Sequence, residues 1–538
     1  MTLHALSRTA RGAQRRLSAE HGFTMIMALG VMLVTSLLVA AVLVAVAGDT
    51  NTTRHDLDSK RAYSAARAGL NAFLYNLDEN PNYWSTCGND VAGVTPVPGA
   101  STAVSYSFQP VYNSGYTAAT CSTNAVGALI DPLTGSLRVK FTGYSGSTPQ
   151  VSRTIVAAFR KRSPLDFLWY TVYETEDPVT NSSCGQWYRQ GAASSCAIVW
   201  ANDVMNGPMY TQDQLKIGSG ATPTFGRTKQ DLIESEGPTL CTGSCGSANV
   251  KGTPIAPVPT SDQVAFPTSN AQLATDAQNH GQVYKGTTNV FLGPPAAPAG
   301  QAKVVVCPTA TTCTAGTTVD LSTYPILAAT NLSGCSGAYD PTNVTYSQTS
   351  SGYYYGPCGD IYVSGQYSTP LTISAGDNIV ITGNLTTSLT GTATLGLVAN
   401  QFVRVMHGVK SGSGCTGGVI EDSSHTIDNA VIDAAILTLG HSFIVDNYNR
   451  GCHSNLDTLT VNGAIAQKYR GPVGTGSSTP TTGYSKNYGY DDRLHVLLPP
   501  YLFDIVTSAW QLSRETLCTP DPTLPTLPAA QNCGYTGT

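Results

Sequence analysis

The chain has 538 residues, of which only 12% are charged, and its formal net charge at pH 7 is −5. This balance excludes the concentrated basic surface that nucleic-acid-binding proteins carry, so we expect no nucleic-acid partner. The length predicts two or three domains, with enough chain to bury a hydrophobic core.

The N-terminus joins a basic segment to a long apolar stretch. Residues 23–47 contain no charged side chain, and four arginines precede them: Arg8, Arg11, Arg15 and Arg16. A signal-peptide core has about 7–15 residues and a membrane-spanning helix about 20, so this stretch is long enough to span. The arginines predict a cytoplasmic N-terminus and an extracytoplasmic remainder. Cleavage after Ala47 would release a secreted protein, whereas cleavage between Gly22 and Phe23 would keep the helix.

Residues 49–78 continue the helical signal. They contain no proline, and apolar side chains recur at three- and four-residue steps: Tyr63, Ala66, Leu70, Phe73, Leu74 and Leu77. This spacing predicts an amphipathic helix that ends at Asn80-Pro81-Asn82. The two segments together predict one rod of about 55 residues and about 80 Å.

The basic leader, Gly22, the segment Phe23-Thr24-Met25-Ile26 and the long helix resemble the N-terminus of type IV pilins and type II secretion pseudopilins. The resemblance implies cleavage after Gly22 by a prepilin peptidase and N-methylation of Phe23. It also implies storage in the inner membrane as a single-pass protein, followed by packing against other pilin subunits in a cell-surface filament. The residues expected in the membrane and then in the filament core are Phe23, Met27, Leu29, Leu33, Leu37 and Leu43.

One position departs from the family pattern. Major pilins have Glu as the fifth residue of the mature chain, where it pairs with a neighbouring subunit's terminal amine; here that residue is Met27. An uncompensated carboxylate in an apolar core is costly, so a subunit without a neighbour above it has no use for one. K-type minor pseudopilins similarly lack this Glu. Met27 favours a minor subunit at the tip or start of a filament, or a pilin-like protein that never polymerises.

The remainder is predicted to be mainly β. Residues 81–164 contain alternating runs that predict a pilin-like antiparallel β-meander. In residues 165–513, short apolar runs between Gly and Asn turns resemble right-handed β-solenoid rungs. NIVITGNL (378–385) and TLTVNGAIA (458–466) align at an offset of 80 residues, with Leu385 matching Ile465, which suggests about four coils of roughly 20 residues. A β-sandwich is the alternative. Trp510 and the run from Tyr501 to Val506 are expected to cap this domain, and residues 514–538 to form a Pro/Thr-rich tail.

The 14 cysteines lie on the predicted extracytoplasmic side, where disulfides persist. Proximity suggests short-range pairs among Cys184 and Cys196, Cys241 and Cys245, Cys307 and Cys313, Cys335 and Cys358, Cys415 and Cys452, and Cys518 and Cys533. Cys241-x-x-x-Cys245 also has the spacing of half a zinc site, but no second Cys or His pair follows at short range. We therefore expect no metal and no other cofactor.

No catalytic motif stands out. Glycoside hydrolysis needs two opposed carboxylates, and five acids qualify by location alone: Asp360, Asp377, Asp428, Asp433 and Asp446. His441, His453 and the group Asp491-Asp492-Arg493 with His495 are expected to be polar loop residues. Tyr484, Tyr488 and Tyr490 fit either a sugar-binding surface or the core.

The predicted map is a basic leader (1–22), the long helix (23–80), the meander (81–164), the extracytoplasmic β-domain (165–513) and the tail (514–538). The predicted function is a non-enzymatic minor pilin-like subunit of a type IV pilus or related secretion filament, whose head serves adhesion to a glycan or host surface, or assembly initiation. The alternative is a membrane-tethered or secreted β-helix protein that binds or degrades extracellular polysaccharide.

Overall fold

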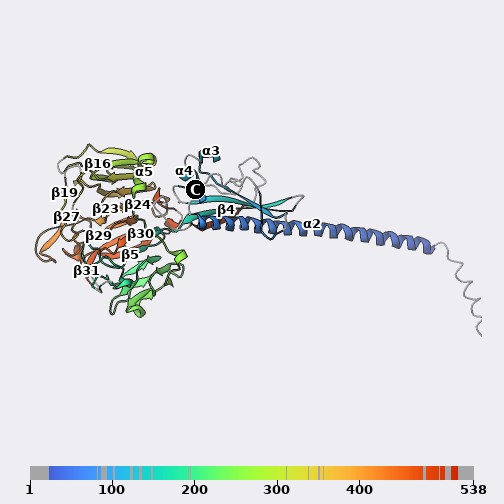
Figure 1. Ribbon diagram of the computed structural model, residues 1–538, viewed down its shortest axis with the longest axis horizontal. Coiled ribbons are helices and arrows are strands. Elements are labelled where there is room, and N and C mark those ends of the chain that lie inside the picture. Colours follow the sequence, from blue (N-terminus) through green and yellow to red (C-terminus); the bar gives the residue numbers. More distant parts are fainter. Residues whose placement is uncertain are drawn as a thin grey trace, which may run out of the picture.

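The computed structural model (Figure 1) shows a long helix followed by a mainly β region. It describes residues 23–518 except 81–82, 86–93, 101–102, 122–124, 132–135, 147–149, 192, 194, 310–311, 337–338, 349–351, 355–356, 477–479, 496 and 503–509. Helix α2 (Phe23–Glu79) is one continuous element of 57 residues. Both the apolar and the amphipathic segments therefore belong to the same rod, as the pattern predicts.

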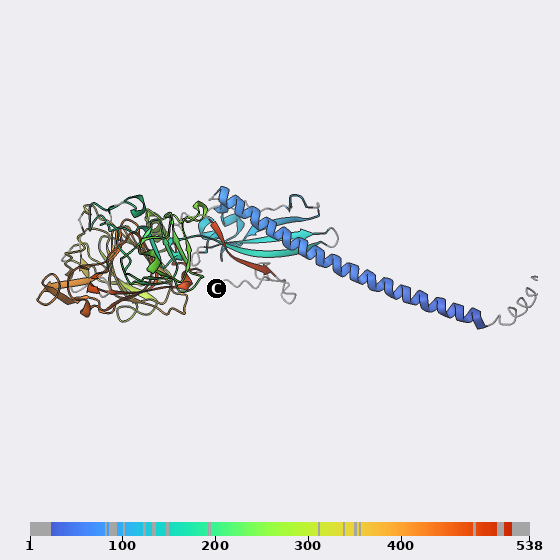
Figure 2. The ribbon, with the colours of Figure 1, turned by 90° about the horizontal axis from the view of Figure 1, so that it is seen from below.

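The second half of α2 packs on a small antiparallel sheet. Of the predicted face, Ala66, Leu70, Phe73 and Leu77 are buried. The sheet has the order β1 (Thr95–Pro96), β2 (Ser105–Pro110), β3 (Leu137–Ser145), β4 (Val151–Lys161) and β34 (Trp510–Cys518). We call this sheet with the second half of α2 the helix–sheet unit. Figure 2 shows the first half of α2 projecting beyond it.

Close contact between α2 and β3 depends on glycine. A Cβ at Gly143 would lie 1.9 Å from the carbonyl oxygen of Ala62 and 2.3 Å from the backbone nitrogen of Ala66. Farther along the helix, the Phe73 ring packs within 5.2–5.7 Å of the rings of Phe108, Phe141 and Phe159. Small residues thus bring the backbones together at one end, and aromatic rings fill the wider gap at the other.

Strand β34 corrects the predicted domain map. Residues 510–518 were expected to be a cap and the start of a tail, but they pair antiparallel with β4, and Trp510 lies opposite Lys161. Trp510 is buried, and its ring centroid lies 5.9 Å from that of Trp84 in the helix–sheet unit. Everything between β4 and β34 is therefore inserted between two neighbouring strands of one sheet. Residues 519–538 lie outside the described residues.

The inserted region, which we call the ladder body (residues 165–502), is built mainly from parallel strands. One ladder contains ten strands in the spatial order β14 (Gln282–Lys285), β18 (Ile326–Thr330), β22 (Leu371–Ala375), β24 (Leu395–Ala399), β28 (Val431–Thr438), β30 (Thr458–Tyr469), β5 (Trp169–Tyr173), β7 (Met209–Thr211), β10 (Leu232–Ser235) and β13 (Thr253–Ile255). The strands of a β-sandwich pair antiparallel, so this parallel ladder differs from the sandwich that was the alternative expectation.

Further ladders run beside this one. One joins β15 (Thr288–Leu292), β21 (Ile361–Gln366), β23 (Ile379–Thr386), β25 (Val403–Val405) and β29 (Phe443–Val445). Another joins the first half of β30 to β33 (Ser485–Tyr490), β6 (Val204–Asn206), β9 (Thr224–Phe225) and β12 (Asn249–Val250). A shorter parallel pair joins β8 (Leu215–Ile217) to β11 (Cys241–Gly243).

Antiparallel pairs decorate these ladders. They are β15 with β16 (Gln301–Val306) and β17 (Thr317–Asp320), β19 (Ser347–Gln348) with β20 (Tyr353–Tyr354), β26 (His407–Ser411) with β27 (Val419–Thr426), and β31 (Gly474–Gly476) with β32 (Pro480–Gly483). Helix α5 (Ala271–His280) lies beside β14 and β18. These additions make the connections between ladder strands unequal in length.

Stacking along the ten-strand ladder aligns apolar side chains. A single register column contains Leu327, Ile373, Leu397, Ile436, Ile465, Trp169, Met209 and Ile233. All eight are almost fully buried and belong to one hydrophobic core. This column provides the burial that isolated strands lack, since each strand covers the apolar face of the next.

The chain enters this stack in its middle. Strand β5 lies between β30, which comes about 290 residues later in sequence, and β7. Residues 169–255 therefore stack away from β30 in one direction, and residues 282–469 approach β30 from the other end. Residues 256–281 connect β13 at one end of the stack to β14 at the other. In Figure 1 the green strands lie at one end of the ladder body and α5 lies at the other.

A buried polar cluster joins the two runs. The Arg470 guanidinium lies 3.8 Å from the Trp200 ring centroid, and its Nη1 lies 3.4 Å from Oε2 of Glu174. Glu174 also accepts hydrogen bonds from Thr171, Trp169 and Trp200. Arg470 follows β30 and Glu174 follows β5, so this ion pair lies where the late strands meet the early ones.

Disulfides close local loops in the ladder body. The structure pairs Cys184 with Cys196, Cys241 with Cys245, Cys307 with Cys313, Cys335 with Cys358, and Cys415 with Cys452. Cys121 and Cys518 are also disulfide-bonded, and Cys533 lies outside the described residues. The largest of the five loops spans 37 residues, so these bonds hold loops onto neighbouring strands rather than joining distant parts.

Candidate assembly surface and head pocket

The first half of α2 exposes a long, mainly apolar surface. Met27, Leu29, Leu33, Leu37 and Leu43 are all about 60% exposed. The segment Met25–Val44 has a mean hydropathy of 2.6 and is long and apolar enough to cross a membrane. Phe23 begins the helix, and the predicted cleavage partner Gly22 lies outside the described residues.

The polar side chains within this stretch satisfy themselves. The Thr35 hydroxyl donates to the Val31 carbonyl at 2.8 Å, and the Ser36 hydroxyl donates to the Leu33 carbonyl at 2.9 Å. A hydroxyl bonded to its own helix can enter an apolar environment without losing a hydrogen bond. The surface is therefore suited to lipid or to other apolar helices.

The helix–sheet unit is fixed to the ladder body by arginines at the end of β4. Arg160 is buried, forms an ion pair with Asp166, and donates to the carbonyl of Leu494 at 2.9 Å. Arg162 forms an ion pair with Glu234 in β10 and donates to the Asp262 carbonyl at 2.6 Å. These two cations therefore hold the helix–sheet unit and the ladder body together.

The five candidate acids do not form one catalytic pair facing a cavity. Asp446 is fully buried and accepts two hydrogen bonds from Arg404, at 2.9 and 2.8 Å. Asp433 accepts from the backbone of Thr387 and the side chain of Asn462. Asp428 lies at an exposed turn, where Asn429 donates to it. These contacts satisfy backbone turns and buried charges.

Asp360 and Asp377 are the two candidates that lie close together. The Asn378 amide donates to Asp360 at 3.0 Å and to Asp377 at 3.2 Å. Burial raises the pKa of Asp360, and burial together with the Asp360 carboxyl raises the pKa of Asp377 to about 6. Asp360 is fully buried, whereas Asp377 is half-buried.

The predicted loop residues have structural partners. The His441 Nδ1 lies 2.9 Å from Asp177 Oδ1, and its ring stacks on Phe402 with centroids 4.4 Å apart. His453 Nδ1 bonds the Gly483 carbonyl at 2.8 Å, while Arg493 pairs with Asp491.

The remaining candidates are the acidic group with His495 and the three tyrosines. Arg227 forms an ion pair with Asp492 at 2.8 Å, and His495 Nδ1 lies 3.9 Å from Asp166. The three candidate sugar-binding tyrosines are buried and belong to the main core: Tyr484, Tyr488 and Tyr490.

One group of cysteine and acid side chains is a candidate metal site. Among the described residues, Cys335, Cys358 and Asp377 lie close enough to share an ion. Cys335 and Cys358 are bonded to each other, however, so neither supplies the thiolate that a metal requires. Cys241 and Cys245, the other candidate pair, are likewise joined in a disulfide.

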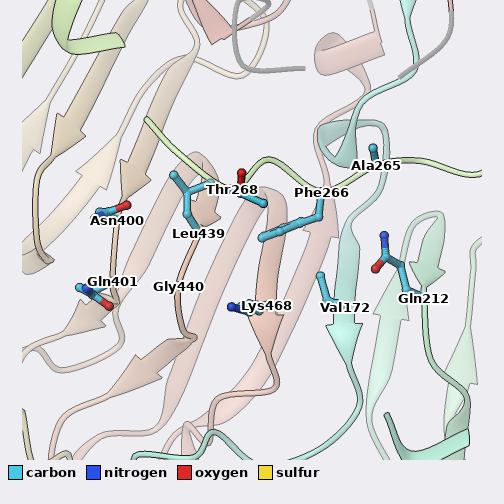
Figure 3. Close-up of a pocket in the computed structure, with 10 residues that line it drawn as sticks. All are labelled: Val172, Gln212, Ala265, Phe266, Thr268, Asn400, Gln401, Leu439, Gly440 and Lys468. Carbon is cyan, nitrogen blue, oxygen red and sulfur yellow. The ribbon is translucent and has the colours of Figure 1, made fainter. Parts of the chain in front are cut away.

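An open pocket of about 460 Å³ lies on the outer face of the ten-strand ladder (Figure 3). Its floor is a row of residues from five consecutive strands or the residues just after them: Asn400, Leu439, Lys468, Val172 and Gln212. Each directly follows one member of a register-matched set: Ala399, Thr438, Gln467, Thr171 and Thr211. Side chains alternate between faces of a strand, so this whole row points outward.

The connecting segment 256–270 forms the opposite wall of the pocket. Ala265, Phe266 and Thr268 contribute to the lining, and the Phe266 ring stacks on Tyr170 with centroids 5.5 Å apart. In Figure 3 this segment, which carries Thr268, Phe266 and Ala265, runs across the strands that carry Lys468 and Val172.

Hydrogen bonds hold this wall at both ends. The Tyr170 hydroxyl donates to the Val264 carbonyl at 2.6 Å, and the Val264 amide donates to the Tyr210 hydroxyl at 3.1 Å. At the other end, Asn270 donates to the Ala375 carbonyl at 2.8 Å. The pocket is therefore preformed.

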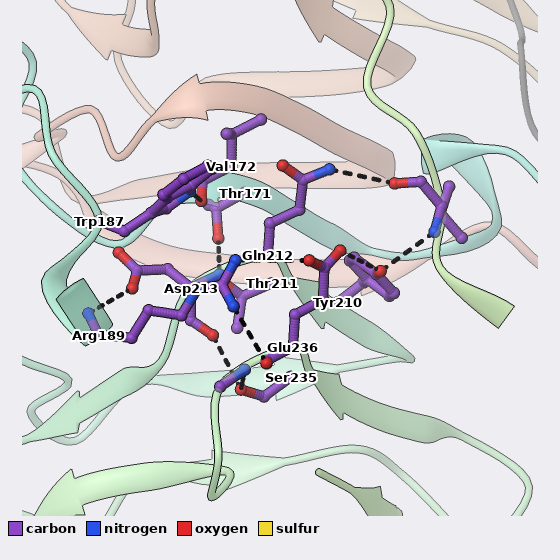
Figure 4. A network of polar contacts seen from close by, with 12 residues as sticks. Thr171, Val172, Trp187, Arg189, Tyr210, Thr211, Gln212, Asp213, Ser235 and Glu236 are labelled. Carbon is purple, nitrogen blue, oxygen red and sulfur yellow. Dashed lines mark hydrogen bonds and ion pairs between the residues drawn. The ribbon is translucent and has the colours of Figure 1, made fainter. Parts of the chain in front are cut away.

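A polar network supports one end of the pocket (Figure 4). Gln212 donates to the Tyr170 hydroxyl at 2.9 Å, and the Tyr210 hydroxyl donates to Glu236 at 2.6 Å. Burial raises the pKa of Glu236, while the hydrogen bond from Tyr210 and the adjacent Arg189 oppose that change. These bonds fix the orientation of Gln212 at the pocket floor.

Sequence reasoning missed this pocket. Its members are scattered through residues 172–468 and belong to no motif. In the structure Asn400 and Leu439 directly follow strands and Lys468 lies near the end of β30, and only the strand register shows that they form a row.

A crystal structure of the competence-associated pilin ComZ from Thermus thermophilus matches with a TM-score of 0.25 and 11% sequence identity, over 86% of this chain and 97% of that one. No protein-family model matches, and no curated protein matches.

Proposed function

We propose that this chain is a non-enzymatic, minor pilin-like subunit of a type IV pilus or related secretion filament that displays a large β-rich head. The proposal depends on one observation: the exposed apolar segment and the packed amphipathic segment belong to one uninterrupted helix. A discarded signal peptide has no need to continue into the helix that packs on the folded head.

The exposed half of α2 needs an apolar environment. The bilayer provides one before assembly, and a bundle of equivalent helices from other pilin subunits provides one afterwards. In this proposal the basic leader is removed after Gly22 by a prepilin peptidase, and the helix passes from the inner membrane to a surface filament. Met27 carries no charge that needs a partner, which supports a minor position at the tip or start of the filament.

The ladder body supports a display role. We infer that its parallel ladders are the walls of a β-solenoid, because a continuous column of inward apolar residues runs from Leu327 to Ile233. Its insertion between β4 and β34 leaves α2 and its packing surface unobstructed. Such a head adds surface for a ligand without changing the part that would pack in a filament.

Analysis of the mature N-terminus tests the proposal. We expect intact mass and N-terminal sequencing of the native chain to show a start at methylated Phe23. Gly22→Val should block this cleavage and keep the chain in the inner membrane, whereas the control Gly12→Val, in the same leader, should be processed normally. A start at Gly48 would contradict the proposal, since the mature protein would lack the apolar helix.

A second experiment addresses catalysis. Asp360→Asn and Asp377→Asn remove the one candidate carboxyl pair whose members lie close together. We expect the wild-type chain and both variants to release no reducing ends from polygalacturonate or from an amylose control. Turnover by the wild type that either substitution abolishes would favour the polysaccharide-degrading alternative.

A further inference from the structure

The pocket on the ladder body has a shape suited to a linear ligand. Its floor crosses five consecutive strands, β24, β28, β30, β5 and β7, from Asn400 to Gln212. Four spacings of about 4.8 Å give a row of about 19 Å. A volume of about 460 Å³ lies in the usual range for small-ligand sites.

The chemistry of the lining narrows the ligand class. Asn400 and Gln401 each offer a carboxamide, which presents a donor and an acceptor in one plane and so matches adjacent hydroxyl groups. The Gln212 amide group donates to the Tyr170 hydroxyl and the Val264 carbonyl, so Gln212 offers the ligand its carbonyl oxygen as an acceptor. Phe266 adds an aromatic wall against which the C–H face of a sugar ring packs. A chain of sugar rings can bond the carboxamides through its hydroxyl groups and pack a ring on Phe266. A lipid chain, by contrast, would leave the carboxamides without hydrogen-bond partners.

Charge in the lining comes from a single cation. Lys468 lies in the middle of the floor, and none of the ten lining residues is acidic. Lys468 is half-buried, and its ammonium group favours a ligand with an anionic group near its centre. The absence of acids from the lining also leaves no pair of carboxyls there for glycoside hydrolysis.

We infer that this pocket binds a linear acidic glycan, such as a chain of uronic acids, across the strands of the ladder. A sugar carboxylate pairs with Lys468, flanking hydroxyls bond the carboxamides at either end, and one ring packs on Phe266. Because Val264 and Asn270 fix the overlying wall, the site is ready before the ligand arrives. This inference rests on the proposed display role only for its biological meaning, since binding does not require a filament.

Calorimetry on the full-length chain in detergent tests the site. We expect trigalacturonate to bind saturably and more tightly than maltotriose, a neutral trisaccharide. Phe266→Ala should weaken both sugars by about tenfold or more. Lys468→Gln should weaken trigalacturonate by about tenfold and leave maltotriose unchanged. The matched control Lys285→Gln removes an exposed lysine from β14 of the same ladder and should change neither.

Three results would overturn the inference. The first is that neither sugar binds saturably, and the second is that all variants bind trigalacturonate as tightly as the wild type. The third is that the peptide Glu-Glu-Glu binds as tightly as trigalacturonate, which would indicate a general anion site. Matching thermal unfolding curves for the three variants show that any loss is local. The calorimetry uses solubilised full-length chain, so a failure to bind sugar would not change the result of the N-terminal analysis. In the same way, a mature N-terminus at Gly48 would not change a positive sugar-binding result.

Discussion

The buried ion pair between Glu174 and Arg470 offers a direct test of how the ladder body is joined. Both side chains are almost fully buried, and they come from segments about 300 residues apart in sequence. Removing one partner of a buried pair costs about 3–5 kcal/mol because the other charge is left uncompensated. In Arg470→Met, Glu174 keeps three neutral hydrogen-bond donors: Thr171, Trp169 and Trp200. We therefore expect the loss of unfolding free energy to lie at the lower end of this range, about 3 kcal/mol.

The double variant separates charge from packing. In Glu174→Gln/Arg470→Met neither charge is present and the side-chain volumes are nearly kept, so we expect stability within about 1 kcal/mol of the wild type. Urea unfolding followed by tryptophan fluorescence is a suitable assay, because Trp169, Trp187 and Trp200 all lie in the ladder body. With a slope of about 3 kcal/mol/M, the single variant shifts the midpoint by about 1 M.

Arg450→Met is the control, since Arg450 makes an exposed hydrogen bond with Asn343 and should shift the midpoint little. The reasoning fails if Arg470→Met unfolds at the wild-type urea concentration. It also fails if the double variant is as unstable as the single one, because the loss would then come from the other contacts of Arg470, with the Ile198 carbonyl, Asp203 and the Trp200 ring.

Three further changes test the packing and the carboxyl pair. Gly143→Ala places a methyl group inside the α2 backbone and should cost about 1–3 kcal/mol by thermal unfolding, whereas Gly30→Ala, with open space around it, should cost nothing. Phe73→Ala empties the aromatic core of the helix–sheet unit and should cost about 3–5 kcal/mol in the same assay. The pKa of Asp377 is raised to about 6, so the folded state loses stability as pH rises from about 4 to 6 and this carboxyl ionises. Asp377→Asn removes that loss. We therefore expect the variant to be more stable than the wild type by about 1 kcal/mol at pH 7, after allowing for solvent screening, and to differ little from it at pH 4. An equal effect of Asp377→Asn at both pH values would contradict that assignment.

Local patterns in the sequence predicted much of the fold. The three- and four-residue spacing of Ala66, Leu70, Phe73 and Leu77 identified the face of α2 that packs on the sheet. The short apolar runs between turns are strands in the structure, from β8 to β30. These features depend on neighbours within one turn or one strand, so the sequence contains them directly.

Long-range pairing was not readable in the same way. The sequence alignment matched Leu385 with Ile465 over four equal coils, but Leu385 stacks on Ile432, which stacks on Val461. This prediction is wrong because the hairpin of β26 and β27 lengthens one connection between ladder strands. Nothing local in residues 510–518 shows that they return to β4, since an edge strand of the helix–sheet unit needs few apolar residues.

The place of the insertion determines how a force on the head would reach the helix. The chain leaves the small sheet at Lys161 and returns opposite it at Trp510, so both connections meet the same end of two neighbouring strands. Strand β4 is hydrogen-bonded to β3 on one side and to β34 on the other, and separating it along its length would break both sets of bonds at once. The ion pairs of Arg160 and Arg162 lie at this junction and resist bending of the head on its two connections. A pull on the ladder body would therefore load β4 and β34 at the same end, where β4 is hydrogen-bonded to a strand on each side.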